Sequence, residues 1–177
     1  MRKLVLLLIA FTGFAHADVV DSATGGFDLK TTISIKATPE EVYRRLVQNV
    51  GDWWSSDHTY SRDAHNLSIE AKPMGCFCEQ LPPGGSVRHM QVVSVFPGKS
   101  LGLTGALGPL QNIAANGNMR FAVSPGEGGT KLEFTYAVTG YLPAGMNTLA
   151  APVDAVLKEQ LTRLKNYVEH GDPSKKD

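Results

Sequence analysis

The sequence has little cysteine, no excess of positive charge and no long hydrophobic run beyond its N-terminus. Of its 177 residues two are cysteines, and 17 Lys and Arg balance 17 Asp and Glu. The basic pair Lys175-Lys176 lies in a polar tail. Because nucleic-acid binding normally requires a basic patch or stripe, we expect no nucleic-acid partner.

The one strongly apolar run, residues 4–14, is typical of a secretory signal. It follows Arg2 and Lys3 and precedes Ala15-His16-Ala17, which is the charged, apolar and small-residue order of such a signal. The run is shorter than the roughly 20 residues that a membrane-spanning helix needs. We therefore expect cleavage after Ala17 and a periplasmic or secreted protein with no stable membrane insertion, and an uncleaved anchor is the alternative. Cleavage would leave 15 basic and 17 acidic residues, a formal charge of −2.

The rest of the chain fits one domain, because about 160 residues suffice to bury a sizeable core and no repeat or linker divides them. We expect a signal peptide at 1–17, an N-terminal extension at 18–26, the domain at 27–169 and a flexible tail at 170–177.

The start of this domain predicts a strand followed by a helix. Residues 27–36 alternate apolar and polar groups with period two, which is typical of a half-buried strand. The stretch Thr38-Pro39-Glu40-Glu41 forms a T-x-x-E capping box with proline at the first helical position. A helix over 39–50 should end at Gly51, and a short helical turn should then carry Trp53 and Trp54.

A series of strands and a long amphipathic helix follow. Turn residues separate six further predicted strands: 67–72, 76–81, 87–96, 101–105, 116–124 and 131–140. Residues 147–169 place apolar side chains at spacings of three and four, which predicts an amphipathic helix. Pro152 either starts this helix in its first turn or kinks it.

These elements predict an α+β helix-grip fold. A curved antiparallel sheet of about six to seven strands would wrap around the C-terminal helix, with two short helices after strand one. A sheet with one apolar face must be covered, and the last helix is the one element long enough. The space between sheet and helix is a natural site for an apolar ligand.

The same element order, with "ATPEEVYRRLVQNVGDWW" after the first strand and the closing "LAAPVDAVLKEQLTRLKNYVE", resembles the SRPBCC (START-like) superfamily. Within it, the chain is similar to the polyketide cyclase/dehydrase and heat-shock-ATPase-activator-like branch over residues 27–169. The resemblance implies a cavity between sheet and helix in a family that binds, and sometimes transforms, lipids, hormones, polyketides or aromatic compounds. It implies no catalytic residue, and the export signal departs from the cytoplasmic stress proteins of that branch.

Large apolar side chains on the predicted concave face serve either the core or the ligand. We take the following as candidate ligand-binding residues: Trp53, Trp54, Phe77, Met90, Phe121, Phe134, Tyr136, Leu149, Val153 and Leu157.

The two cysteines, Cys76 and Cys78, stand one residue apart on a predicted strand. Their alpha carbons would lie about 6.6 Å apart on a regular strand, near the upper limit of about 6.8 Å for a disulfide, so a bond requires a bulge or a tightened turn. Export favours oxidation. Packed free thiols and a soft-metal site are the alternatives, but no histidine or methionine stands at a recognisable ligand spacing, and we expect neither a metal nor another cofactor.

Three further features of the sequence each allow a functional and a structural interpretation. The loop 57–66 concentrates polar and titratable groups that could perform acid–base chemistry, but a solvated loop is the simpler interpretation. His89 with Glu79 is a second candidate pair, and cross-strand charge pairing explains it as well. The glycine-rich segment 105–119 is either a flexible lid or an ordinary folded-back loop.

The sequence therefore supports three hypotheses. The first is an exported protein that binds a small apolar or aromatic molecule. The second is a cyclase- or dehydratase-type enzyme that uses a cavity-facing His, Tyr or acidic residue. The third is an envelope interaction or chaperone-like module, for which the sequence identifies no protein partner.

Overall fold

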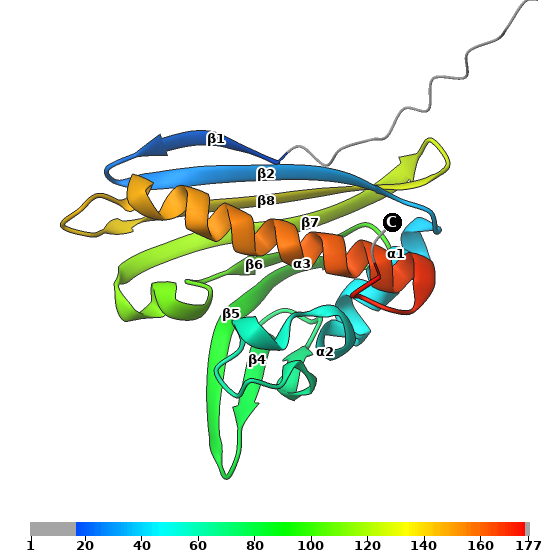
Figure 1. The fold of residues 1–177 in the computed structure, drawn as a ribbon, viewed down its shortest axis with the longest axis horizontal. Coiled ribbons are helices and arrows are strands. Elements are labelled where there is room, and N and C mark those ends of the chain that lie inside the picture. Colours follow the sequence, from blue (N-terminus) through cyan, green and yellow to red (C-terminus); the bar gives the residue numbers. More distant parts are fainter. Residues whose placement is uncertain (1–16, 176–177) are drawn as a thin grey trace, which may run out of the picture.

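The computed structural model describes residues 17–175, which form an eight-stranded antiparallel sheet crossed by one long helix (Figure 1). The strands are β1 (Ala17–Ala23), β2 (Gly26–Ile35), β3 (Leu67–Ile69), β4 (Cys76–Leu81), β5 (Gly85–Phe96), β6 (Ser100–Thr104), β7 (Ala114–Gly126) and β8 (Gly129–Tyr141). The α-helices are α1 (Pro39–Gln48), α2 (Val50–Trp53) and α3 (Ala150–His170). Short 3-10 helices are η1 (Ser56–His58), η2 (Ala64–Asn66), η3 (Gly108–Asn112) and η4 (Met146–Leu149).

The predicted α+β helix-grip class is confirmed, with two corrections. The sheet has eight strands, in the order β1-β2-β8-β7-β6-β5-β4-β3, and the short helices follow the second strand. The additional strand is β1, in the segment expected to be an extension. It pairs with β2 at the sheet edge, and its Val19 and Val20 remain exposed. A strand at the sheet edge pairs through backbone hydrogen bonds. It therefore needs no apolar periodicity, and the sequence did not reveal it.

The concave face of the sheet is apolar because its strands alternate in register. On β2 and β8 the paired residues Leu29 and Tyr136, and likewise Ile33 and Leu132, are buried on the same face. The later strands β3 to β8 overlap the six ranges that the sequence predicts. The turn residues between them therefore located these strands well.

The helix α1 begins at the predicted cap. Thr38 Oγ1 accepts the backbone N–H of Glu41, and Pro39 occupies the first turn. The Glu41 carboxylate accepts hydrogen bonds from Arg44 and Arg45, which lower its pKa to about 2. Only the threonine half of the predicted capping box is therefore formed.

The helix α3 begins at Ala150 and is not interrupted by Pro152, which lies in its first turn, where a backbone N–H has no helical partner to lose. It ends at Gly171, whose φ of 75° is the left-handed conformation of a helix C-cap. Within residues 17–175, no helix has the length and apolar character needed to span a membrane.

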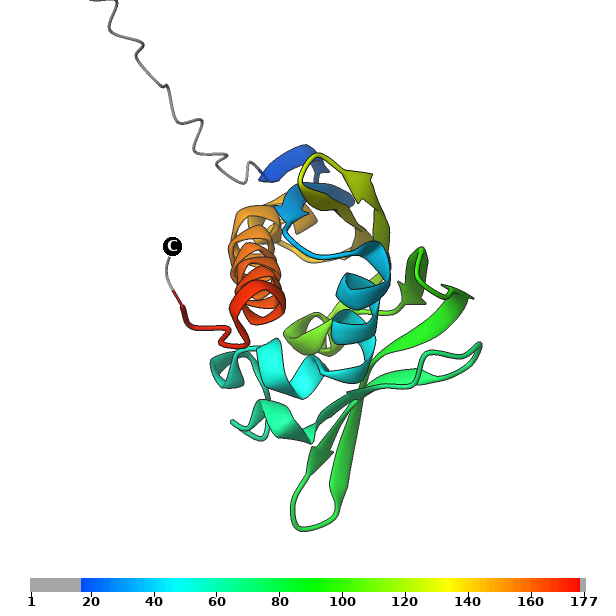
Figure 2. The ribbon, with the colours of Figure 1, turned by 90° about the vertical axis from the view of Figure 1, so that its right-hand side faces the viewer.

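The helix α3 covers the part of the concave face nearest β2, and the strands curve around it in the end-on view of Figure 2. Its own side chains Leu157, Leu161 and Leu164 are buried. Its C-terminal half is also tied to the segment after α2. Gln160 Oε1 accepts the N–H of Ser55 at 2.8 Å, and Arg163 Nε donates to the Trp53 carbonyl at 2.9 Å.

We predict that Leu161→Ala lowers the free energy of unfolding by about 2 to 5 kcal/mol, because it leaves a void between α3 and the sheet. The exposed neighbour Thr162→Ala is the matched control and should change it by less than about 0.5 kcal/mol. Urea unfolding followed by circular dichroism measures both. Equal effects of the two variants would contradict this packing.

Candidate functional site

A cavity of about 450 Å³ lies at the N-terminal half of α3, where the helix does not meet β4 and β5 directly. One wall is a row of apolar side chains on and just before α3: Leu149, Pro152, Val153, Val156 and Leu157. The opposite wall comes from β4, β5 and the segment after α2, and the side is closed by residues 107–110 and Ile113 around η3. The lining is predominantly apolar, and the volume falls within the range of about 300–1,000 Å³ typical of small-molecule sites.

Half of the candidate ligand-binding residues line this cavity. They are Trp54, Phe77, Leu149, Val153 and Leu157.

The other half fill the core and are not among the cavity-lining residues. They are Trp53, Met90, Phe121, Phe134 and Tyr136. All ten are on the predicted apolar side, but the sequence does not reveal which part of that side α3 leaves uncovered. For the five that line the cavity, contact with a ligand stays a prediction.

Trp54 forms the floor between helix and sheet. Its ring meets Phe77 edge-on, with centroids 5.4 Å apart, and its Nε1 donates to the His58 carbonyl at 3.1 Å. The hydrogen bond that Ser55 N–H donates to Gln160 and the one that Arg163 donates to the Trp53 carbonyl hold this segment against α3. The aromatic floor is therefore fixed in position by the helix that forms the opposite wall.

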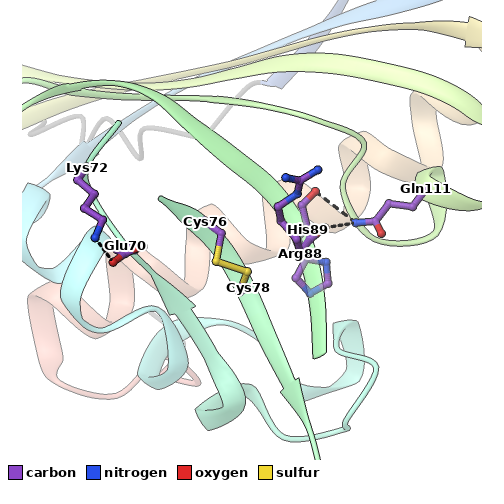
Figure 3. Close-up of a disulfide and its surroundings, with 7 residues drawn as sticks. All are labelled: Glu70, Lys72, Cys76, Cys78, Arg88, His89 and Gln111. Atoms are coloured by element: carbon purple, nitrogen blue, oxygen red, sulfur yellow. Dashed lines mark hydrogen bonds and ion pairs between the residues drawn. A yellow bond between two sulfur atoms is a disulfide. The ribbon is translucent and has the colours of Figure 1, made fainter. Parts of the chain in front are cut away.

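The glycine-rich segment closes the cavity as an anchored loop. Tyr136 Oη accepts the N–H of Leu107 at 3.1 Å and donates to the Gly105 carbonyl at 3.3 Å. Burial raises the pKa of Tyr136 to about 12, with a small opposing effect of the Leu107 hydrogen bond, so its hydroxyl stays protonated. Gln111 Nε2 donates to the carbonyls of Arg88 and His89 on β5 (Figure 3). These hydrogen bonds make the segment a folded-back loop and not a loose lid.

One polar group stands behind the apolar wall. The side chain of Glu79 on β4 is fully buried and accepts the backbone N–H groups of Tyr60 and Ser61 and a hydrogen bond from His89 Nε2 at 3.0 Å. Burial alone raises the pKa of Glu79, but the hydrogen bonds from Ser61, Tyr60 and His89 outweigh it and lower the pKa overall. Glu79 is therefore an ionised acceptor.

A β-bulge turns His89 toward the cavity. Phe77 pairs with Met90 and Cys78 with Arg88, so His89 is the extra residue on β5. His89 and Met90 are consequently both buried, whereas regular alternation would place these neighbours on opposite faces of the strand. This bulge explains why the facing of the Glu79–His89 pair was ambiguous in the sequence.

The imidazole of His89 is held between two rings. Tyr60 stacks on it with centroids 5.9 Å apart, and Phe77 lies at 5.3 Å. Burial lowers the pKa of His89, partly offset by the hydrogen bond to Glu79. Its Nδ1 has no hydrogen-bond partner among residues 17–175.

The polar loop 57–66 divides into two parts. Asp57, His58 and Tyr60 line the cavity, and His58 Nε2 lies 3.1 Å from Glu159 Oε2 on α3 at its rim. Asp63 and His65 pair with each other in an exposed position away from the lining. The candidate acid–base cluster is therefore not one site.

The two cysteines form a disulfide on β4, with alpha carbons 5.4 Å apart (Figure 3). Phe77 and Glu79 are buried on the concave side, and the half-buried cysteines alternate with them on the other face. This distance is shorter than the roughly 6.6 Å of a regular strand, and the register shift between Phe77 and Cys78 lies between the two cysteines. Across the part of the chain that the structure describes, no group of His, Cys, Asp and Glu side chains is arranged to hold a metal ion.

Comparisons with known proteins place the chain in a family. Residues 27–169 match the model of the polyketide cyclase/dehydrase and lipid transport family, and the chain belongs to it. Proteins of this SRPBCC type are typically modules that bind hydrophobic ligands. No curated protein matches the sequence.

Solved structures share the fold at low sequence identity. A conserved protein of unknown function, EF2215 from Enterococcus faecalis, is 21% identical with a TM-score of 0.60, over 92% of this chain and 82% of that one. The Aha1 dimer from Colwellia psychrerythraea is 19% identical with a TM-score of 0.57, over 81% and 97%. DynU16, from the dynemicin biosynthetic locus, is 18% identical with a TM-score of 0.57, over 85% and 50%.

We predict that Glu79→Ala lowers the free energy of unfolding by about 3 to 5 kcal/mol, because His89 and two buried N–H groups lose their acceptor. Glu133→Ala is the matched control, since Glu133 is a partly exposed residue of β8 paired with Lys30, and it should cost less than about 1 kcal/mol. Chemical denaturation at pH 7 compares the two. Similar losses would contradict the buried role of Glu79.

We also predict that replacing both cysteines by serine lowers the free energy of unfolding by only about 1 to 2 kcal/mol, because the loop they close is very short. Intact-mass measurement before and after reduction should show a difference of about 2 Da, the two hydrogens gained when one disulfide is reduced. An unreduced protein with two free thiols would contradict the disulfide.

Proposed function

We propose that this protein binds a small apolar or aromatic molecule in the cavity beside α3 and carries or sequesters it. The observation that supports this most strongly is an apolar cavity of about 450 Å³ within a folded domain. Its apolar lining stays in contact with water until a ligand covers it, which is unfavourable. Burial of apolar ligand surface, at about 25 cal/mol per Å² before association costs, supplies the driving force.

We place this function outside the cytoplasm. The N-terminal pattern of a signal peptide supports export, although residues 1–16 lie outside the described residues. The Cys76–Cys78 disulfide is consistent with an oxidising compartment.

The Glu79–His89 pair favours one second function, proton transfer on the bound molecule. An imidazole at the cavity wall with a carboxylate behind it has the geometry of a general base. Binding is the function that the lining supports best, because the remaining surface is predominantly apolar.

We predict that Val156→Trp weakens binding of the uncharged dye N-phenyl-1-naphthylamine by at least about tenfold, because the indole fills the cavity. Val93→Trp introduces the same side chain at a position on β5 that is 53% exposed and should leave binding unchanged. Dye fluorescence titration measures both affinities. Undiminished binding to the Val156 variant would contradict a ligand site beside α3.

A further inference from the structure

His89 presents an unpartnered buried nitrogen at the cavity wall. The residue is 5% exposed, it lines the cavity, and its Nδ1 has no hydrogen-bond partner among the described residues. Buried polar atoms in folded proteins are almost always hydrogen-bonded to protein or to another molecule. Three other unpartnered buried atoms, on Tyr43, Asn49 and Trp53, belong to residues that do not line the cavity. Of these four unpartnered buried atoms among the described residues, the His89 nitrogen is therefore the one that belongs to a cavity-lining residue.

The hydrogen-bonding role of this nitrogen follows from its neighbour. The ionised carboxylate of Glu79 can only accept, so His89 Nε2, at 3.0 Å, carries the proton. A neutral imidazole with its proton on Nε2 has a lone pair on Nδ1. Nδ1 is therefore an acceptor and needs a donor from the ligand.

The acceptor is also fixed in direction. Tyr60 stacks nearly parallel to the imidazole at an interplanar angle of 11°, and Phe77 packs at 43°. The hydrogen bond to Glu79 holds the ring against rotation. A rigid acceptor of this kind reduces the entropic cost of binding a matching donor.

The charges around the cavity disfavour an acidic ligand. Among the described residues that line it, none is Lys or Arg, whereas Asp57 lies on the wall and Glu79 lies behind His89. A carboxylate or phosphate group would meet these acids with no cation to balance it.

We propose that the ligand is an uncharged apolar or aromatic molecule that carries a hydroxyl group, and that this hydroxyl donates its hydrogen bond to His89 Nδ1. The inference rests on the proposed function and narrows its ligand to phenols and apolar alcohols, as distinct from fatty acids and plain hydrocarbons.

The test uses two probes with the same ring system, of which one has a hydroxyl donor and the other has it blocked by a methyl group: 2-naphthol and 2-methoxynaphthalene. Calorimetry measures the affinity of each for the wild-type protein, for His89→Phe and for the exposed control His65→Phe. His89→Phe should lower the affinity for 2-naphthol by about fivefold, which corresponds to the loss of one ordinary hydrogen bond. The same substitution should leave the affinity for 2-methoxynaphthalene unchanged or raise it. His65→Phe should alter the affinity for neither probe.

A second readout needs no variant and covers the case in which His89→Phe fails to fold. In wild-type protein with ¹⁵N-labelled histidine, the His89 ring should carry its proton on Nε2. Its Nδ1 resonance should shift on addition of 2-naphthol and not of 2-methoxynaphthalene.

The outcomes separate the two proposals. If both probes bind in the cavity but respond equally to His89→Phe, or shift Nδ1 equally, the hydroxyl inference is overturned and the binding function stands. If neither probe binds, or both bind Val156→Trp as well as the wild type, the proposed function fails and the inference falls with it.

Discussion

The structure depends on burial of one wide, curved apolar sheet face by a single helix. Buried and less buried side chains alternate along β2 and β8, so the concave face of these strands must be covered, and α3 covers it with Leu161 and Leu164. One helix is narrower than an eight-stranded sheet. The short helices, the aromatic segment at Trp54 and the loop around η3 close the remaining width only in part, and the cavity lies where they meet. The ligand site is thus a consequence of the same burial that stabilises the fold.

A local irregularity gives this apolar space its polar feature. The bulge on β5 places His89 on the concave side, and the disulfide on β4 lies directly across the same register shift. Glu79 then fixes the imidazole through Nε2 while accepting two backbone N–H groups from the loop after η1. The buried carboxylate therefore links three functions: it holds the loop, it orients the histidine and it sets which ring nitrogen accepts. An otherwise nonspecific apolar cavity acquires one directional contact.

Much of the fold follows from the sequence, and about half of the predicted ligand-contacting set lines the cavity. Period-two alternation at 27–36 and helical periodicity at 147–169 report burial directly, so these elements were predictable. The edge strand β1 was not, because backbone pairing leaves Val19 and Val20 exposed and without periodicity. Phe121 and Phe134, which were expected to serve either the core or the ligand, pack on each other in the core with ring centroids 5.0 Å apart. Alternation indicates which side of a strand is buried, but not whether a helix or an empty space lies opposite. The sequence indicated His89 only as one member of a candidate acid–base pair. A bulge changes the face of the strand on which a side chain lies, and it leaves no distinctive signal in the sequence.

The most direct test of the ligand site is a crystal structure of the protein soaked with 6-bromo-2-naphthol, in which anomalous scattering locates the bromine. We expect a bromine peak in the cavity bounded by Phe77, Leu107 and Val156. A cavity closed by its own side chains, with bromine bound only at the surface or not at all, would contradict it.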